Sequence, residues 1–155
     1  MTVLAIATTV LSVLSPYLQK AGQKVAEMIG EELYPTIKRL FIIPEEEVAL
    51  ENFKKDPSAG NREKVKGILI QKLSDEKNEK ELNEIKNTLK LTDSKAFNIE
   101  ILVEQIEKAR EDIEFFSLGE NEVDETARGN WKMKVLSKQK HLKDLEARLL
   151  KTLND

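Results

Sequence analysis

The chain has 155 residues, which is enough for one domain or for one domain with an appended helical element. Its 25 Lys and Arg nearly balance 28 Asp and Glu, so the formal charge of −3 gives no reason to expect nucleic-acid binding. The sequence has no Cys, which excludes disulfides, thiolate zinc sites and cysteine nucleophiles. With 34% charged residues but only 6 Gly and 4 Pro, the composition argues against an all-β fold.

The segment from Met1 to Gln19 carries no charged side chain. As one helix from Thr2 to Gln19 it would be about 27 Å long, against about 30 Å of bilayer hydrocarbon. It is therefore marginal as a permanent span but long enough to enter a membrane. No basic residue precedes it, so we do not expect a cleaved secretory signal. The predicted membrane-inserting or core helix carries these large aliphatic residues: Val3, Leu4, Ile6, Val10, Leu11, Val13, Leu14 and Leu18.

Small or polar residues recur at helical spacing within this apolar segment, and they predict a helix–helix stripe. Thr8 and Ser12 also form a small-xxx-small pair, which lets helix backbones approach closely in lipid. A helix that is apolar around most of its circumference has to be buried. Three alternatives stay open: the central helix of a soluble bundle, a stored helix released into a membrane, and a permanent membrane anchor. The stripe consists of Ala5, Thr8, Ser12 and Ser15.

Short amphipathic helices are predicted to follow. Pro16 is expected to kink the first helix or to start a second one, and Gly30 to break the next. Pro44 with its following glutamates suits a helix start, and that helix is expected to stop at Asp56-Pro57. Asn61 is a candidate N-cap for the helix after it.

At Ser74-Asp75 we expect a helix cap or an interruption. The helical pattern of apolar residues then continues to Thr92-Asp93-Ser94, which indicates a linker and the N-cap of a further helix. We therefore predict a helical bundle of about five helices over residues 1–92. A second domain over residues 95–155 is predicted to be a charged, coiled-coil-like antiparallel helical hairpin. Its seam residues are Ile99, Leu102, Ile106, Ile113, Phe116, Trp131, Leu142, Leu145 and Leu149, with Ala109 and Val135 at the same spacing.

Charge supports the pairing of the two arms, which Ser117–Asn121 is expected to separate. Residues 99–125 carry ten acidic and two basic residues, for a net charge of −8, whereas residues 128–151 carry eight basic and two acidic residues, for +6. Lys138 occupies a seam position that should be apolar, and Trp131 is expected to pack against Phe115 or Phe116. An alternative is that the basic arm meets anionic lipid or RNA. Because the acidic partner lies in the same chain, no nucleic-acid partner is expected.

The residues that carry chemistry do not form a recognisable catalytic or metal-binding pattern. His141 is the single His, so a two-His zinc motif is impossible, and the glycines fit no phosphate-binding loop. The acidic pairs are expected to lie on solvated helix faces. We therefore predict that the protein is not an enzyme and uses no cofactor or metal.

The opening of the chain resembles the N-terminal effector regions found beside NTPase-type immune receptors in bacteria, in particular the Bell domain, an analogue of fungal HeLo-like cell-death domains. The resemblance is carried by the uncharged run from Val3 to Leu14 and then by Pro16-Tyr17-Leu18-Gln19-Lys20-Ala21-Gly22-Gln23-Lys24-Val25-Ala26-Glu27. It covers residues 1–90. It implies a helical bundle whose N-terminal helix leaves the bundle and attacks the cell's own membrane after induced oligomerisation.

The leading hypothesis is a membrane-active, pore-forming or membrane-perturbing effector in bacterial cell-death and defence signalling. We expect it to self-associate, to contact membrane lipid, and to be cytoplasmic with recruitment to the inner face of the cell membrane. The alternative is a non-enzymatic soluble adaptor or scaffold that docks a protein partner through the C-terminal hairpin.

Overall fold

A computed structural model describes residues 1–119 and 125–155, leaving aside the side chains of residues 93, 119 and 125–128. Within the described ranges the regular elements are all helical, which confirms the predicted all-α fold. The elements are α1 (Val3–Leu18), α2 (Lys24–Leu40), α3 (Pro44–Lys55), α4 (Ala59–Ser74), the short 3₁₀ helix η1 (Glu76–Asn78), α5 (Glu79–Thr88), α6 (Asp93–Gly119) and α7 (Glu125–Asn154).

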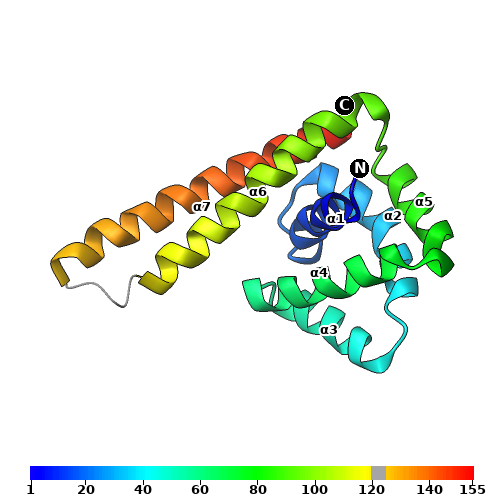
Figure 1. The fold of residues 1–155 in the computed structure, drawn as a ribbon, viewed down its shortest axis with the longest axis horizontal. Helices are drawn as coiled ribbons and strands as arrows, with labels where there is room; N and C mark the ends of the chain where they lie inside the picture. The colour runs from blue at the N-terminus through cyan, green and yellow to red at the C-terminus, as the bar shows by residue number, and fades with distance from the viewer. Residues whose placement is uncertain (120–124) are drawn as a thin grey trace.

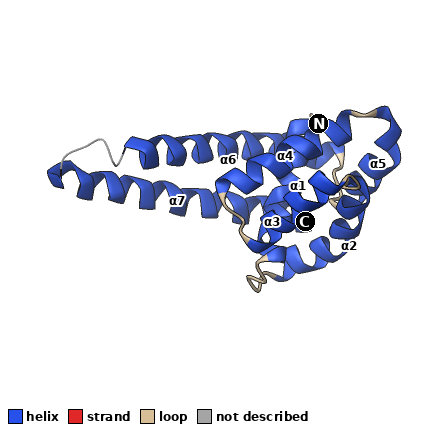
Figure 2. Ribbon diagram, turned by 90° about the horizontal axis from the view of Figure 1, so that it is seen from below, coloured by secondary structure: helices blue, strands red, loops and turns tan. Residues whose placement is uncertain are grey.

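Helices α1 to α5 form a bundle, and α6 and α7 run antiparallel beside each other and extend beyond it (Figures 1 and 2). The base of this hairpin rests on the bundle. Ile99 and Ile106 of α6 and Leu149 of α7 belong to the same hydrophobic cluster as Leu11 of α1. The base of the hairpin and the bundle therefore share one core, and the division into two domains near residue 92 stays a prediction.

Helix α1 begins at a side-chain N-cap and ends two residues after a proline. The Thr2 side chain accepts a hydrogen bond from the Ala5 amide at 3.1 Å, as an N-cap does. Pro16 lies inside α1, so the expectation that a second helix starts there was wrong. Pro16 removes one helical hydrogen bond, and α1 continues for only two residues beyond it. The chain then turns through Gly22, whose φ of +77° favours glycine, before α2 begins.

Gly30 does not break a helix, contrary to expectation, because α2 continues through it. Its role is to allow close packing against Tyr17. A Cβ atom added at Gly30 would lie 2.4 Å from the Tyr17 Cγ atom. The sequence pattern could not separate this role from a helix stop, since glycine serves both.

The junction between α3 and α4 is held by side chains that cap both helices. Pro44 is the first residue of α3, as predicted, and Asp56 follows its end. Ser58, and not Asn61, is the N-cap of α4, so that expectation was wrong. The Asn61 side chain instead donates to the carbonyl oxygens of Asp56 (2.7 Å) and Asn52 (3.3 Å). Asn61 therefore satisfies carbonyl groups at the end of the preceding helix.

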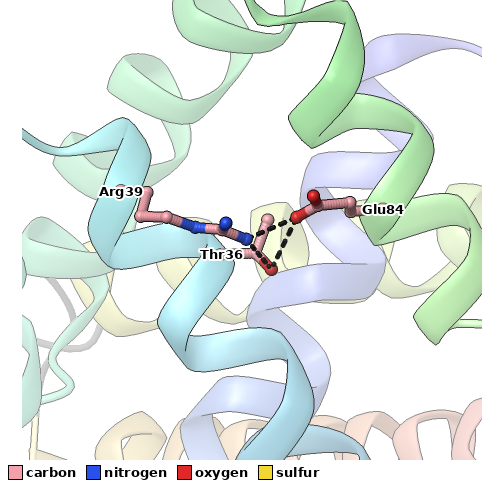
Figure 3. Close-up of polar contacts among 3 residues, drawn as sticks. All are labelled: Thr36, Arg39 and Glu84. Carbon is pink, nitrogen blue, oxygen red and sulfur yellow. Dashed lines mark hydrogen bonds and ion pairs between the residues drawn. The ribbon is translucent and has the colours of Figure 1, made fainter.

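Helix α2 also contacts α5 through a small polar cluster at the edge of the bundle (Figure 3). Arg39 pairs with the Glu84 carboxylate, and its guanidinium donates to the Thr36 hydroxyl at 3.1 Å. The Thr36 hydroxyl in turn lies 3.4 Å from Glu84. The Arg39 side chain is 54% exposed, so this cluster joins α2 and α5 at the edge of the bundle. The centre of the bundle is occupied by α1.

Candidate functional site at the buried N-terminal helix

Helix α1 is the central helix of the bundle. Every residue from Ala5 to Ser15 is buried, and α1 contacts α2, α4, α6 and α7 (Figure 1). The fully buried aliphatic residues are Ile6, Val10, Leu11, Val13 and Leu14. Val3 and Leu18 are half-buried at the two ends of the helix. Leu4 is 48% exposed, so of the two predicted roles, membrane-inserting or core, the core role was wrong for this residue, although Ala5 and Ile6 in the same turn are buried.

All four residues of the stripe are buried, and two of its hydroxyls bond to charged side chains on other helices. The Thr8 hydroxyl donates to Glu107 of α6 at 2.9 Å. The Ser15 hydroxyl accepts from the Arg62 guanidinium of α4 at 2.7 Å. The Ser12 hydroxyl is buried and has no hydrogen-bond partner among the described residues. The stripe is thus the face of α1 that forms hydrogen bonds with α4 and α6.

Glu107 is itself held by a lysine. The Lys66 ammonium of α4 lies 3.1 Å from one Glu107 oxygen and 3.0 Å from Glu63. Burial acts to lower the pKa of Lys66, but the hydrogen bonds and charges of Glu63 and Glu107 outweigh it and raise that pKa. Lys66 is therefore charged at neutral pH and fixes the carboxylate that receives the Thr8 hydrogen bond.

Arg62 has a different environment from Lys66. Its guanidinium meets the neutral Ser15 hydroxyl, and its buried Nε atom has no hydrogen-bond partner among the described residues. Burial lowers the pKa of Arg62, and the more distant charges of Glu146 and Glu107 oppose that effect. Glu146 lies 2.9 Å from the Arg110 guanidinium, and burial raises its pKa. Half-buried charged side chains therefore surround the end of the stripe.

The hairpin seam is buried mainly toward its base, although Val135 is buried farther along the hairpin. Trp131 packs edge-on against Phe116, with ring centroids 5.4 Å apart, as expected. Val103 is buried beside the seam but was not predicted. The structure buries Ile99, Ile106, Ala109, Val135, Leu145 and Leu149, and it half-buries Leu102, Ile113, Phe116, Trp131 and Leu142.

The charges of the two arms meet in two ion pairs between described side chains. Lys138, at the seam position that should be apolar, lies 3.4 Å from Asp112. The pair between Arg110 and Glu146 has the opposite sense, with the base on the acidic arm. The break between the arms was expected to begin at Ser117, but α6 continues through Gly119, so that part of the expectation was wrong; the rest of the expected segment, residues 120 and 121, lies outside the described part of the chain.

The charged partners of the stripe were not singled out from the sequence, although their spacing carries a signal. Arg62 and Lys66 stand at the same helical spacing as Leu69, so all three share the inner face of α4. Arg110 likewise falls four residues after buried Ile106. Charged residues placed on the apolar face of a helix are therefore the pattern that would have found this site.

Within residues 1–119 and 125–155, no cluster of three or more potential ligand side chains is arranged to hold a metal ion. In the same ranges no helix combines the length and the hydropathy needed to cross a bilayer. In comparisons with known proteins, no family model, no curated protein and no solved structure matched the chain.

Proposed function

We propose that the protein is a non-enzymatic, membrane-active effector whose helix α1 is stored in the bundle and released when copies of the chain associate. One observation carries this proposal. A helix without charged side chains occupies the centre of the bundle, although 34% of the residues of the chain are charged. The role that we propose for this activity, in bacterial cell-death and defence signalling, is the one that the resemblance of residues 1–90 to Bell-type effector regions implies. The protein then acts from the cytoplasm on the inner face of the cell membrane.

The energetics of α1 suit an exchange between two apolar environments. Burial of a large aliphatic side chain is worth about 1.5–3 kcal/mol, and a bilayer supplies that term as well as a protein core does. What α1 loses on release are the contacts of its stripe, namely Thr8 with Glu107 and Ser15 with Arg62. In lipid, the same small and polar stripe suits packing of α1 against other copies of itself. The unpartnered hydroxyl of Ser12 fits such a second environment.

The outer faces of the hairpin supply a surface for self-association. Phe115 and Leu118 of α6 are each 68% exposed, and Met133 and Leu136 of α7 are 69% and 63% exposed. Their spacing places each pair on the side of its helix opposite the seam. One arm is acidic and the other basic, so the outer face of α6 complements the outer face of α7 in a second copy. Such head-to-tail contact extends to more than two copies.

Leakage from vesicles containing anionic lipid tests this function. Deletion of residues 1–19 removes the centre of the core, so variants of the intact chain are more informative. The chain is fused to a domain that oligomerises on addition of a small molecule, and dye release is measured with and without that molecule. We expect leakage only after oligomerisation, and faster leakage for Thr8→Val, which loses the bond to Glu107. Thr9→Val is the matched control, because the Thr9 hydroxyl bonds only within α1, to the Ala5 carbonyl.

The proposal fails if no oligomerising condition produces leakage, or if the deletion of residues 1–19 leaks as well as the intact chain. Hydrogen exchange gives a second readout. The α1 amides should lose protection when vesicles and the oligomerising molecule are both present. Protection of α1 equal to that of α2 under every condition contradicts release.

The second candidate function is a soluble adaptor that docks a protein partner through the hairpin. The observation that favours it is the reach of α6 and α7 beyond the bundle (Figure 1). Phe115, near the end of α6, and Met133, near the start of α7, are both exposed. In this case α1 is permanent core. Leu11→Asp should then abolish folding, and α1 should stay protected in every state of assembly.

A further inference from the structure

A cleft of ≈ 680 Å³ opens where the end of α1 meets α4, α6 and α7. Its charged lining comes from three of these helices: Arg62 of α4, Arg110 of α6, and Lys143 and Glu146 of α7. Three positive charges and one negative charge leave the cleft with a net positive charge. The amide side chains of Gln19, Gln23 and Gln139 complete its polar lining.

Arg62 is half-buried in this cleft, its Nε atom is fully buried, and it has no ion-pair partner within the described ranges. A buried charge is costly unless an opposite charge and hydrogen bonds compensate for it. The guanidinium offers five N–H donors in a rigid fork, of which Ser15 uses one. Lys66, one turn along the same helix, shows the contrast because two carboxylates surround it. Arg62 thus has no described carboxylate within ion-pair distance, whereas Lys66 has two, and the charges of Glu146 and Glu107 act on Arg62 only from farther away.

Arg110 adds a second guanidinium to the same cleft. It lies 2.9 Å from Glu146, which is a single-point contact through one of its terminal nitrogens. The remaining N–H groups of both arginines are the donors that bind phosphate oxygens in a bidentate manner. The volume of the cleft also falls in the range of about 300–1,000 Å³ that small-molecule sites occupy.

We propose that this cleft binds a small phosphorylated molecule, with its phosphate held by Arg62 and Arg110 and its uncharged part facing the glutamine amides. The phosphate supplies an anion in direct contact with Arg62, through the N–H groups that Ser15 leaves free. The binding itself is independent of any action on membranes.

The test is a calorimetric titration of the intact chain with inorganic phosphate and with pyrophosphate, at constant ionic strength set with sodium chloride. We expect saturable binding that is tighter for pyrophosphate, and a loss of about tenfold or more in affinity for Arg62→Gln, since a charge-assisted hydrogen bond is worth about that factor. Arg39→Gln is the matched control, because Arg39 belongs to the cluster on α2 and α5 (Figure 3) and not to the cleft. It should leave the affinity unchanged.

A second variant keeps the test valid if Arg62→Gln fails to fold. Lys143→Gln, on the exposed rim of the cleft, should weaken pyrophosphate binding without affecting the fold. A parallel arm compares phosphatidylglycerol with phosphatidylcholine vesicles and asks whether the phosphate is that of a lipid headgroup. Arg62-dependent binding to the anionic vesicles alone assigns the phosphate to lipid, and binding to free pyrophosphate assigns it to a soluble molecule. The absence of saturable binding in both arms, or binding that none of the cleft variants weakens, overturns the proposal.

Discussion

The Thr8 hydroxyl lies 2.9 Å from a carboxylate oxygen of Glu107, and this hydrogen bond joins residues 99 positions apart in the sequence. It connects the central helix α1 to α6, which is one arm of the hairpin. Thr8 is 3% exposed, so the bond lies where the competition of water is weak. Through this hydrogen bond the stripe on α1 is bound directly to a charged residue of the hairpin.

Thr8→Val should lower the free energy of unfolding by about 1–3 kcal/mol, since Glu107 loses a partner while the volume of the side chain is kept. Thr9→Val, on the same buried helix, should change it by less than about 0.5 kcal/mol, because the Thr9 hydroxyl bonds only to the Ala5 carbonyl of its own helix. Urea unfolding followed by circular dichroism measures both. Equal effects of the two substitutions would show that the Thr8 contact adds nothing to stability.

Ser12→Ala should raise the free energy of unfolding by about 1 kcal/mol. The substitution removes a buried hydroxyl without a partner among the described residues and leaves a methyl group in an apolar surrounding. The measurement is again urea unfolding. If Ser12→Ala is stabilising but reduces leakage from vesicles, the hydroxyl is used in the membrane-bound assembly. A destabilised variant would contradict the absence of a partner in the resting state.

Gly30→Ala should destabilise the protein by about 1–3 kcal/mol, although alanine is the better helix former. The added Cβ atom would lie 2.4 Å from Tyr17 Cγ, and the close approach of α1 and α2 has to relax. Gly67→Ala in α4 is the matched control, since nothing lies within 4 Å of its Cβ position. It should stabilise the protein by about 0.5–1 kcal/mol. Thermal unfolding of the two variants should therefore shift in opposite directions.

The burial of Glu146 predicts a dependence of stability on pH. Burial raises its native pKa above the ordinary value of 4.5, against the attraction of Arg62 and Lys143. The native state therefore favours the protonated Glu146 carboxyl more than the unfolded state does. This contribution to the free energy of unfolding is complete below pH 4.5 and is lost as the pH rises through the raised native pKa. The free energy of unfolding of the natural chain should fall relative to that of Glu146→Gln over this interval. A difference that stays constant, or that grows with pH, would contradict the direction of the shift.

Self-association through the hairpin predicts a specific loss. Leu136→Glu places a negative charge among the basic residues of the outer face of α7, where a second copy should offer its acidic arm. The sedimentation coefficient at high concentration should return to the monomer value. Ile42→Glu, at an equally exposed apolar residue between α2 and α3, should leave the association unchanged. Loss of association in both variants would mean that the contact is not confined to the hairpin.

Much of this architecture could be predicted because apolar spacing decides which face of a helix is buried. The seam residues Ile106 and Leu149, and the aromatic contact between Phe116 and Trp131, follow from that spacing alone. The roles of Gly30 and Asn61 could not be predicted, because each residue type serves at either end of a helix or at a close contact. The partners of the stripe depend on tertiary placement: Arg62 and Glu107 come from helices far apart in sequence, and local patterns treat both as solvated charges.

The shared core at the base of the hairpin has a mechanical consequence. Helix α6 runs for about 40 Å, and only its first part rests on α1, so the hairpin is a long lever fixed at one end. A force applied at the far end of the hairpin is borne by the contacts of α6 with α1, which include the hydrogen bond between Thr8 and Glu107. If copies of the chain associate through the hairpin as proposed, crowding of the hairpins would strain their contacts with α1.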